Sequence, residues 1–258
     1  MKSAIFTGKG GVGKTTILST LSRLLARDGH RVLVIDCDPS MNLAMSLGVP
    51  LSQVKPISDT RSLIQESMEA EEEDDHTRHQ TELDLHLEDY IMEARDGVQL
   101  VVMGTIPFGG AGCLCSSISL VKMLLGYLST DAHNQDFILI DSQAGVEIFG
   151  RGLAREFDAS FVITEPTPKS LEVARQSMKL ARDLGVKRQI LVVNKVEEDG
   201  DRRRASETLG ADADAICSVG YDRDVVRADK EGDLVLDRAP QAQLISDVMK
   251  LKRCMLET

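Results

Sequence analysis

The sequence predicts an α/β protein in which a doubly wound, mostly parallel sheet is flanked by helices on both faces. Short apolar runs rich in β-branched residues recur along the 258 residues, and segments with helical spacing lie between several of them. Apolar runs without alternation are typical of strands that are covered on both faces, as in a parallel sheet. The third observation is a glycine-rich loop between the first run and the first helix, which belongs to the same class of fold.

The predicted strands are the apolar runs at residues 3–6, 31–36, 98–103, 137–141, 160–164, 189–194 and 215–219. Residues 15–28 and 169–184 carry apolar side chains at helical spacing, so both are predicted helices. Residues 243–256 have nearly the same spacing and predict a helix that docks on the sheet, with a polar face less basic than membrane binding requires. The chain has no internal repeat and no long Gly/Ser linker, so residues 1–258 are predicted to form a single domain.

The segment at residues 66–96 interrupts this alternation because it is strongly acidic. Three of the five histidines, His76, His79 and His86, lie within it. We expect a solvated helical insertion whose inner stripe includes Tyr90 and Ile91. A surface that attracts metal or docks a partner is the alternative that the sequence leaves open.

The overall composition restricts the compartment and the partners. A net charge of −11 argues against nucleic acid or an anionic membrane as a partner. No signal peptide is visible, and no segment approaches the roughly 18 apolar residues of a membrane span. Five cysteines, an odd number without a signal peptide, indicate a reducing, cytoplasmic location. Cys37, Cys217 and Cys254 lie in or beside apolar runs and are predicted core residues.

The loop GKGGVGKTT at residues 8–16 matches the phosphate-binding pattern G-x-x-x-x-G-K-[ST]. Its glycines let successive backbone N–H groups turn toward a polyphosphate, and the following helix directs the positive end of its dipole at the same anion. Lys14 is predicted to reach the β- and γ-phosphates, and the Thr15 hydroxyl to hold Mg²⁺. The predicted nucleotide-binding residues of this loop are Gly8, Lys9, Gly10, Gly11, Val12, Gly13, Lys14, Thr15 and Thr16.

Polar residues follow the predicted strands at the positions where an open α/β sheet presents its ligand-binding loops. Asp36 ends the second strand and is a candidate for the Mg²⁺ shell, although a helix cap would also explain it. Asp141 ends the run FILID, the Walker B arrangement in which a buried strand fixes a carboxylate near Mg²⁺ and its waters. The backbone of Gly145 is expected to approach the γ-phosphate. Asn194 can read the adenine edge or cap a turn, and residues 220–224 are expected to line the other side of the base.

Cys113 and Cys115 form a Cys-x-Cys pair in a glycine-rich loop. One protomer would offer half of a coordination shell. Four thiolates from the two subunits of a two-fold dimer would complete a tetrahedral zinc site or a square-planar nickel site. Chance or burial in the core explains such a pair equally well when it is taken alone.

Four segments together, KGGVGKTT, DCDPSMNLAMSLG, GAGCLC and DSQAGVEIFGRG, resemble the CooC-type nickel-insertion ATPases, which are accessory proteins of carbon monoxide dehydrogenase. That group shares a deviant Walker A loop with the MinD and nitrogenase iron-protein families. The resemblance covers most of the chain apart from the acidic insertion. It implies a P-loop NTPase fold, Mg²⁺-dependent hydrolysis of ATP to ADP and phosphate, an ATP-driven homodimer, and a carbon monoxide dehydrogenase-like nickel enzyme as the client.

The resemblance also implies roles for individual residues. Lys9 would cross to the partner subunit's nucleotide, and Asp38 would orient the water that attacks the γ-phosphate. Together with Lys14, these residues form the expected catalytic set. Cys113 and Cys115 of both subunits would hold Ni²⁺, or Zn²⁺, and hydrolysis would open the dimer and release the metal to the client.

Two positions depart from the pattern D-x-E-A-G-x-E-H that this family shows after the Walker B strand, because Gln143 and Ile148 replace the acid and the histidine. These departures affect what the resemblance implies about how the loop signals hydrolysis and about which client the protein serves. They leave the prediction of nucleotide binding intact. Two other functions fit the same P-loop class. One is a MinD-type positioning ATPase that binds membranes through its C-terminal helix. The other is an iron–sulfur reductase of the nitrogenase iron-protein type, which is disfavoured because no cysteine lies between Asp141 and Cys217.

Overall fold

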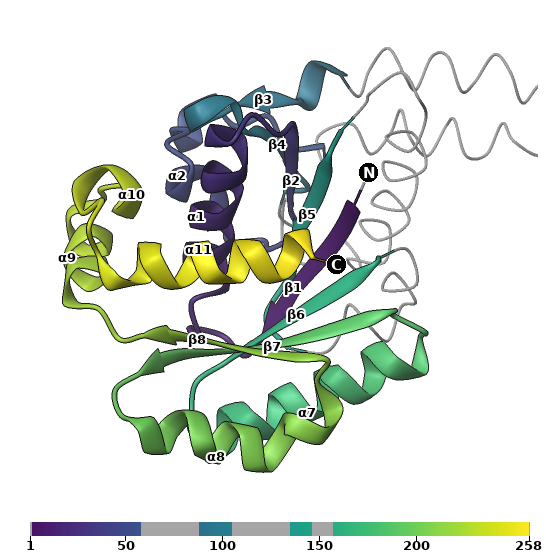
Figure 1. Ribbon diagram of the computed structural model, residues 1–258. Coiled ribbons are helices and arrows are strands. Elements are labelled where there is room, and N and C mark those ends of the chain that lie inside the picture. Colours follow the sequence, from purple (N-terminus) through teal and green to yellow (C-terminus); the bar gives the residue numbers. More distant parts are fainter. Residues whose placement is uncertain (1, 58–87, 105–134, 146–156, 258) are drawn as a thin grey trace, which may run out of the picture.

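The computed structural model of the chain describes residues 2–57, 88–104, 135–145 and 157–257. They form an eight-stranded sheet with the order β3-β4-β2-β5-β1-β6-β7-β8 (Figure 1). β3 runs antiparallel to β4, and the other neighbouring strands are parallel. The strands are β1 (Lys2–Gly8), β2 (Val32–Asp36), β3 (Met92–Glu93), β4 (Gln99–Val102), β5 (Phe137–Asp141), β6 (Ala159–Thr164), β7 (Arg188–Val196) and β8 (Ala215–Gly220).

Helices cover both faces of this sheet, which confirms the predicted doubly wound α/β fold (Figure 1). One face carries α1 (Lys14–Arg27), α2 (Asn42–Ser46), α9 (Arg223–Glu231), α10 (Val235–Arg238) and α11 (Gln243–Leu256). The other face carries α7 (Pro168–Asp183) and α8 (Asp199–Leu209). Short 3₁₀ turns are η1 (Leu51–Gln53), η3 (Glu88–Tyr90), η4 (Arg95–Gly97) and η6 (Gly210–Asp212).

Local sequence signals explain where the helices on the second face begin. α7 starts at Pro168, whose fixed φ suits the first helical position, and the Thr167 hydroxyl accepts a hydrogen bond from the Ser170 N–H. α8 starts with a reciprocal capping box between Glu198 and Asp201. Both starts place the helix directly after the end of a strand, as a βαβ connection requires.

All seven predicted strands are present, with boundaries that differ by up to two residues. The prediction of a helical insertion is wrong for its described end, residues 88–96, because these residues form η3, β3 and the start of η4. Met92 and Glu93 pair with Leu100 and Gln99 as an edge strand of two residues, which is too short to leave a periodic pattern in the sequence. Tyr90 and Ile91 pack against the core beneath this edge, as the inner stripe predicted.

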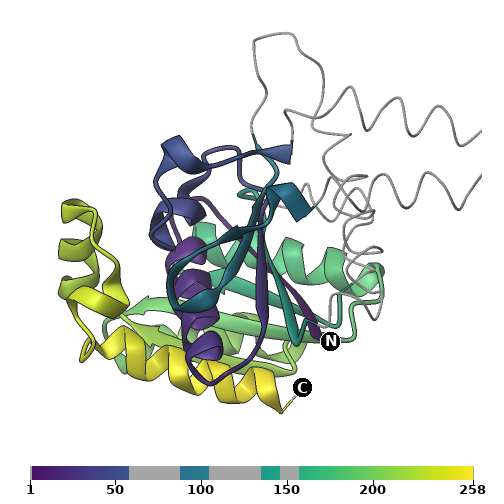
Figure 2. The same cartoon turned by 90° about the horizontal axis from the view of Figure 1, so that it is seen from above.

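The core follows the two faces of the sheet. Phe6 and Phe161, on the neighbouring strands β1 and β6, stack with ring centroids 4.7 Å apart. α11 packs on α1 and β8, and its side chains Leu244, Val248 and Leu251 are buried (Figure 1, Figure 2). Each such side chain contributes about 1.5–3 kcal/mol when it leaves water. The docked C-terminal helix is therefore confirmed.

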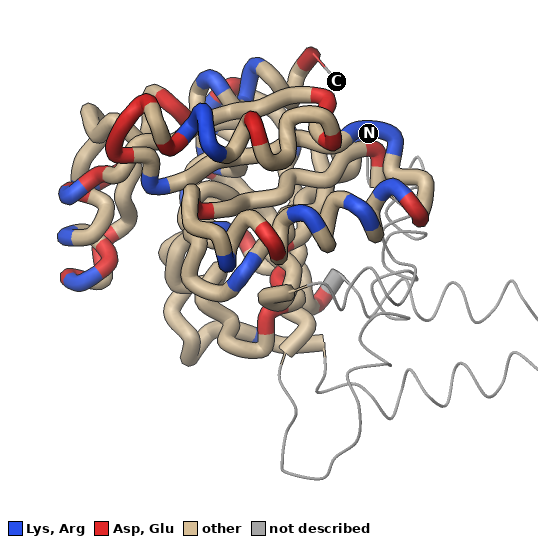
Figure 3. The backbone as a smooth tube through the Cα atoms, turned by 90° about the horizontal axis from the view of Figure 1, so that it is seen from below, with Lys and Arg blue, Asp and Glu red and all other residues tan. Residues whose placement is uncertain are grey.

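The charged residues of the described elements are interspersed, with Lys and Arg next to Asp and Glu along the backbone (Figure 3). Several of them pair between elements that are distant in sequence, such as Lys252 with Asp28 and Arg182 with Asp212. Among the helices of the described ranges, none has the length and apolar character needed to cross a membrane.

Candidate nucleotide-binding site

The glycine-rich loop leaves β1 at the centre of the sheet and enters α1. Gly8 has φ +148°, and a Cβ at this position would overlap the carbonyl oxygen of Ile163 on β6. Gly13 has φ +94° as the residue that precedes α1, and a Cβ there would overlap the amide nitrogen of Asn194. Both positions require glycine because the left-handed backbone and the close neighbour each exclude a side chain. The loop can therefore direct its backbone N–H groups toward an anion at the start of α1.

Two consecutive residues at the end of β7 hold the tip of this loop. The Asn194 Nδ2 donates to the Val12 carbonyl at 2.7 Å, and the Lys195 Nζ donates to the Gly11 carbonyl at 2.8 Å. Lys195 also pairs with the Glu165 carboxylate at 2.5 Å. Asn194 thus contacts the phosphate-binding loop directly, whereas its contact with adenine stays a prediction. Neither Lys195 nor Glu165 is recognisable in the sequence as a contact of this loop, because a lysine after a strand-ending asparagine gives no indication of its distance from the loop.

Lys14, Thr15 and Asp141 lie together below the loop. The Thr15 hydroxyl donates to Oδ2 of Asp141 at 2.7 Å, and Oδ1 of Asp141 is buried without a hydrogen-bond partner. The Lys14 side chain is 6% exposed, and its Nζ lies 3.5 Å from the Gly8 carbonyl. Burial raises the pKa of Asp141 to about 6, while the Thr15 hydrogen bond and the charge of Lys14 act in the opposite direction. The Asp141 carboxylate at the end of β5 is therefore beside the P-loop hydroxyl, and the roles of both groups toward Mg²⁺ stay a prediction.

A second carboxylate lies beside Asp141, because Asp36 on β2 stands opposite Asp141 in the strand register. Its oxygens accept hydrogen bonds from the N–H groups of Asp38 at 3.0 Å and Leu43 at 3.3 Å. Burial, and secondly the charge of Asp141, raise the pKa of Asp36 to about 8. Asp38 itself lines the cleft, and its Oδ1 accepts from the Ser40 N–H at 3.0 Å and the Ser40 hydroxyl at 2.7 Å.

The donor set at this point fits Mg²⁺. The unpartnered buried oxygen of Asp141 and the Thr15 hydroxyl are hard oxygen ligands, which this cation prefers. Within the described part of the chain no group of three or more His, Cys, Asp or Glu residues could hold a metal, but Mg²⁺ at a nucleotide needs only one or two protein ligands. Thr15 and Asp141 would hold the ion, which when bound would neutralise phosphate charge.

The two raised carboxyl pKa values predict how the stability of the nucleotide-free protein depends on pH. An aspartate ordinarily titrates near 4, so between about pH 4 and 8 the folded protein keeps a proton on Asp36 that the unfolded chain releases. The free energy of unfolding therefore falls as pH rises, by up to about 1.4 kcal/mol per pH unit. We expect Asp36→Asn to flatten this slope between pH 5 and 8 in urea unfolding experiments, and exposed Asp28→Asn to leave it unchanged. Equal slopes in all three proteins would contradict the assignment.

The loop that follows Asp141 contacts the beginning of the P-loop. The Gly145 N–H donates to the Gly8 carbonyl at 3.1 Å, and the Thr7 hydroxyl contacts the Gly145 carbonyl at 3.3 Å. Ala144 lines the cleft beside the glycine-rich loop. The predicted approach of Gly145 to a γ-phosphate would need its N–H to leave the Gly8 carbonyl. Ile148, the second departure from the family pattern, lies outside the described residues.

Other predicted residues fall into three groups. Lys9, Gly10 and Gly11 are exposed, and Gly10 and Gly11 line the cleft. Cys113 and Cys115 lie outside the described residues. Cys37, Cys217 and Cys254 are partly buried and pack against the two main apolar clusters, which confirms them as core residues.

A cleft of about 770 Å³ opens from the P-loop and continues along α1. Thr16, Thr20 and Arg23 of α1 line it, residues 48–50 lie on one side, and residues 232–236 lie on the other. Val225 and Asp229 of α9 also line it, whereas the predicted base-contacting loop at residues 220–224 does not. This lining joins segments that are more than 180 positions apart in the sequence, so no local motif could indicate it.

Comparison with known proteins agrees with this geometry. Residues 3–235 match the family described as the CobQ/CobB/MinD/ParA nucleotide binding domain. The chain is 37% identical over 248 residues to the carbon monoxide dehydrogenase accessory protein CooC of Rhodospirillum rubrum, covering 93% of this chain and 91% of that protein. It is also 37% identical to an uncharacterized ATP-binding protein of Methanocaldococcus jannaschii, over 89% of this chain and 88% of the relative.

Among solved structures, the cell division ATPase MinD of Pyrococcus furiosus superposes on this chain with a TM-score of 0.74. The match covers 100% of this chain and 99% of that chain at 22% identity, so it shows a similarity of fold. The glycine-rich loop, the buried Walker B carboxylate and the cleft along α1 are thus found in a chain whose sequence matches a nucleotide-binding family almost throughout. The chain belongs to the CobQ/CobB/MinD/ParA nucleotide-binding family and, within it, to the group of CooC, the carbon monoxide dehydrogenase accessory protein.

Proposed function

We propose that this chain is an ATPase that dimerises on binding ATP, holds nickel between its two subunits and delivers the metal during maturation of a carbon monoxide dehydrogenase-like enzyme. The observation that carries this proposal is the 37% identity to CooC over 93% of the chain, combined with an intact P-loop site. We infer the client from the name of that relative, and we infer the metal ligands from the Cys-x-Cys pair of this sequence.

In this proposal the cleft binds Mg·ATP with its triphosphate at the start of α1. Lys14 and the loop N–H groups neutralise the phosphates, and Asp38, at the carboxyl end of β2, orients the attacking water. Lys9 is exposed beside the loop and reaches the nucleotide of the partner subunit. The nucleoside lies along α1, where the side chains of Val225 and Val235 offer an apolar surface and Asp229 an acceptor for an exocyclic amine.

The metal is the cargo of this cycle. Cys113 and Cys115 from each of the two subunits form a four-thiolate site that exists in the dimer. Thiolate ligands also bind zinc, so the metal that the site takes up in solution depends on supply as well as on affinity. Hydrolysis separates the subunits, halves the site and releases the metal to the client.

The test is an anaerobic titration of the ATP-loaded protein with Ni²⁺ and Zn²⁺. We expect about one metal ion per dimer in the wild type and no stoichiometric binding in the Cys113→Ser, Cys115→Ser double variant. The matched control is the Cys217→Ser, Cys254→Ser double variant, which also removes two thiols but from partly buried positions against the core. Unchanged stoichiometry in the first double variant would overturn the metal-delivery proposal.

Two further measurements separate the proposal from other functions of the same P-loop class. ATP-dependent pelleting with anionic liposomes, lost when residues 243–258 are deleted, would favour a positioning ATPase of the MinD type. Visible absorption bands of an iron–sulfur cluster after anaerobic purification would favour a reductase. We expect neither signal for a metal-delivery ATPase.

A further inference from the structure

The cleft has two sides that meet at its end distant from the phosphates. Gly48, on one side, has φ +78°, and a Cβ at this position would lie 3.1 Å from Cδ1 of Leu234 on the other side. The same Cβ would lie 2.9 Å from Cγ of Arg95 in η4. The segment after α2 and the segment between α9 and α10 are therefore in contact here, and both line the cleft together with α1 (Figure 1).

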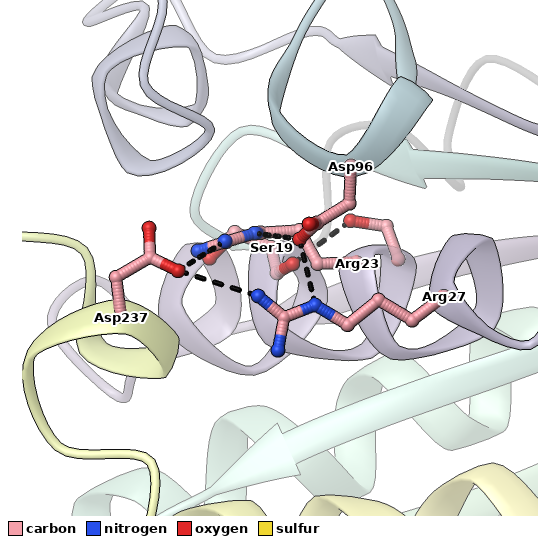
Figure 4. Close-up of polar contacts among 6 residues, drawn as sticks. Ser19, Arg23, Arg27, Asp96 and Asp237 are labelled. Atoms are coloured by element: carbon pink, nitrogen blue, oxygen red, sulfur yellow. Dashed lines mark hydrogen bonds and ion pairs between the residues drawn. The ribbon is translucent and has the colours of Figure 1, made fainter.

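Four charged residues, Arg23, Arg27, Asp96 and Asp237, are joined by ion pairs, and we call them the arginine cluster (Figure 4). Arg23 Nε bonds Asp96 Oδ2 at 2.7 Å, and an Arg23 terminal nitrogen bonds Asp237 Oδ1 at 2.6 Å. Arg27 contacts the same two oxygens, at 3.0 Å and 3.3 Å. One guanidinium pair on α1 thus joins a carboxylate from η4 to a carboxylate from α10.

Each carboxylate is attached to one side of the cleft. Asp237 directly follows the lining residues 232–236. Asp96 follows Arg95, whose N–H donates at 3.1 Å to the carbonyl of Leu47, the residue before Gly48. Asp96 itself has φ +59°, an unusual backbone conformation for a residue other than glycine. The ion pairs from Arg23 and Arg27 hold it in place.

Arg23 is both buried and part of the cleft lining, so its ion pairs with Asp96 and Asp237 bear on nucleotide binding. Its side chain is 2% exposed, so its charge needs both partners to compensate for the loss of water. Arg23 also lines the cleft, one helical turn beyond Thr20 and about two turns beyond Thr16. Burial alone would raise the pKa of Asp96, but the hydrogen bonds from Arg23 and Arg27 hold it below its ordinary value.

We propose that the arginine cluster is a positioning device that sets the separation of the two sides of the cleft where the nucleoside binds, while the P-loop binds the phosphates independently of it. This inference rests on the nucleotide site proposed above. The phosphate-binding residues of the P-loop lie between the end of β1 and the first turn of α1, and within the described part of the chain none of them hydrogen-bonds to Asp96 or Asp237. Loosening the cluster should therefore weaken binding of the nucleoside and spare binding of the phosphates.

The experiment compares the dissociation constants of Mg·ADP and Mg·pyrophosphate by calorimetry, because pyrophosphate is the same anion without the nucleoside. For Asp237→Asn we expect ADP binding to weaken by about tenfold and pyrophosphate binding to change by less than about twofold. Arg27→Gln changes a side chain that is 41% exposed, so this variant should fold. We expect it to weaken ADP binding as well, and it allows the proposal to be tested even if Asp237→Asn unfolds. Thermal unfolding of each variant shows whether it is folded.

The matched control is Asp212→Asn, which removes the partner of Arg182 in an ion pair of 2.9 Å on the opposite face of the sheet. Its side chain is 36% exposed, close to the 44% of Asp237, and we expect it to leave both dissociation constants unchanged. Parallel weakening of ADP and pyrophosphate, or no weakening of ADP in a folded variant, would overturn the proposal. Failure of the wild-type protein to bind ADP would instead overturn the nucleotide site itself.

Discussion

A Lys14→Ala variant will bind Mg·ATP at least about a hundredfold more weakly than the wild-type protein, and its phosphate release will fall to the background rate. Lys14 and Arg23 are the basic residues among the described residues that line the cleft. Arg23 already faces two carboxylates, so Lys14 is the cation left for the phosphates. A buried charge placed beside an anion in a medium of low dielectric contributes more than a charge in water.

The measurements are a calorimetric titration with Mg·ATP and a phosphate-release assay. Lys252→Ala is the control, because Lys252 pairs at 2.5 Å with Asp28, the residue directly after α1, and does not line the cleft. We expect this control to keep wild-type affinity and turnover. A Lys14→Ala protein that binds Mg·ATP within about threefold of the wild type would show that the phosphates lie elsewhere.

The parts of the fold and site that the sequence predicted are those with local signals. Buried parallel strands appear as continuous apolar runs, and all seven such runs are strands of the sheet. Thr15 and Asp141 lie 126 positions apart, yet their contact could be expected. Asp141 ends β5 and Thr15 follows β1, and these two adjacent parallel strands have their carboxyl ends at the same edge of the sheet. Two adjacent parallel strands explain in the same way why Asp36 and Asp141 are neighbours.

The contacts that the sequence did not predict depend on packing between distant segments. In the sequence, Arg23 cannot be distinguished from the other polar residues of an amphipathic helix. Its partners Asp96 and Asp237 lie 73 and 214 positions away. Lys195 and Gly11 are 184 positions apart, and Lys195 lies where the register of β7 is irregular, between Val193 and Val196. Such contacts arise from three-dimensional packing, which a local pattern of apolar and polar residues cannot specify.

The order of these contacts along α1 indicates that different parts of the helix serve different parts of the nucleotide. Thr15, in the first turn, faces Asp141, whereas Arg23 and Arg27, two and three turns further on, face the arginine cluster's carboxylates. In our proposal, the first turn of α1 takes part in binding the phosphates, and the third turn helps to place the nucleoside. Variants at the two ends of the helix should therefore separate binding of phosphate from binding of the base.

An Asp38→Ala variant will lose ATP hydrolysis by about a hundredfold or more but will still dimerise when ATP is added. The Asp38 side chain lines the cleft, and its hydrogen bonds go to Ser40 rather than to the P-loop. Its removal should therefore leave the loop and Lys14 in place, so nucleotide affinity should be nearly unchanged. The loss should appear in kcat, because orientation of the attacking water matters in the transition state.

Phosphate release measured together with sedimentation of the ATP-loaded protein separates these two effects. Ser40→Ala is a graded comparison, because it keeps the carboxylate but removes the 2.7 Å hydrogen bond that orients it, and we expect a loss of a few-fold in kcat. Retained turnover in Asp38→Ala would place the water-orienting group on another residue. Loss of ATP-driven dimerisation together with turnover would instead make Asp38 part of the nucleotide contact between subunits, so that the carboxylate would act before hydrolysis rather than during it.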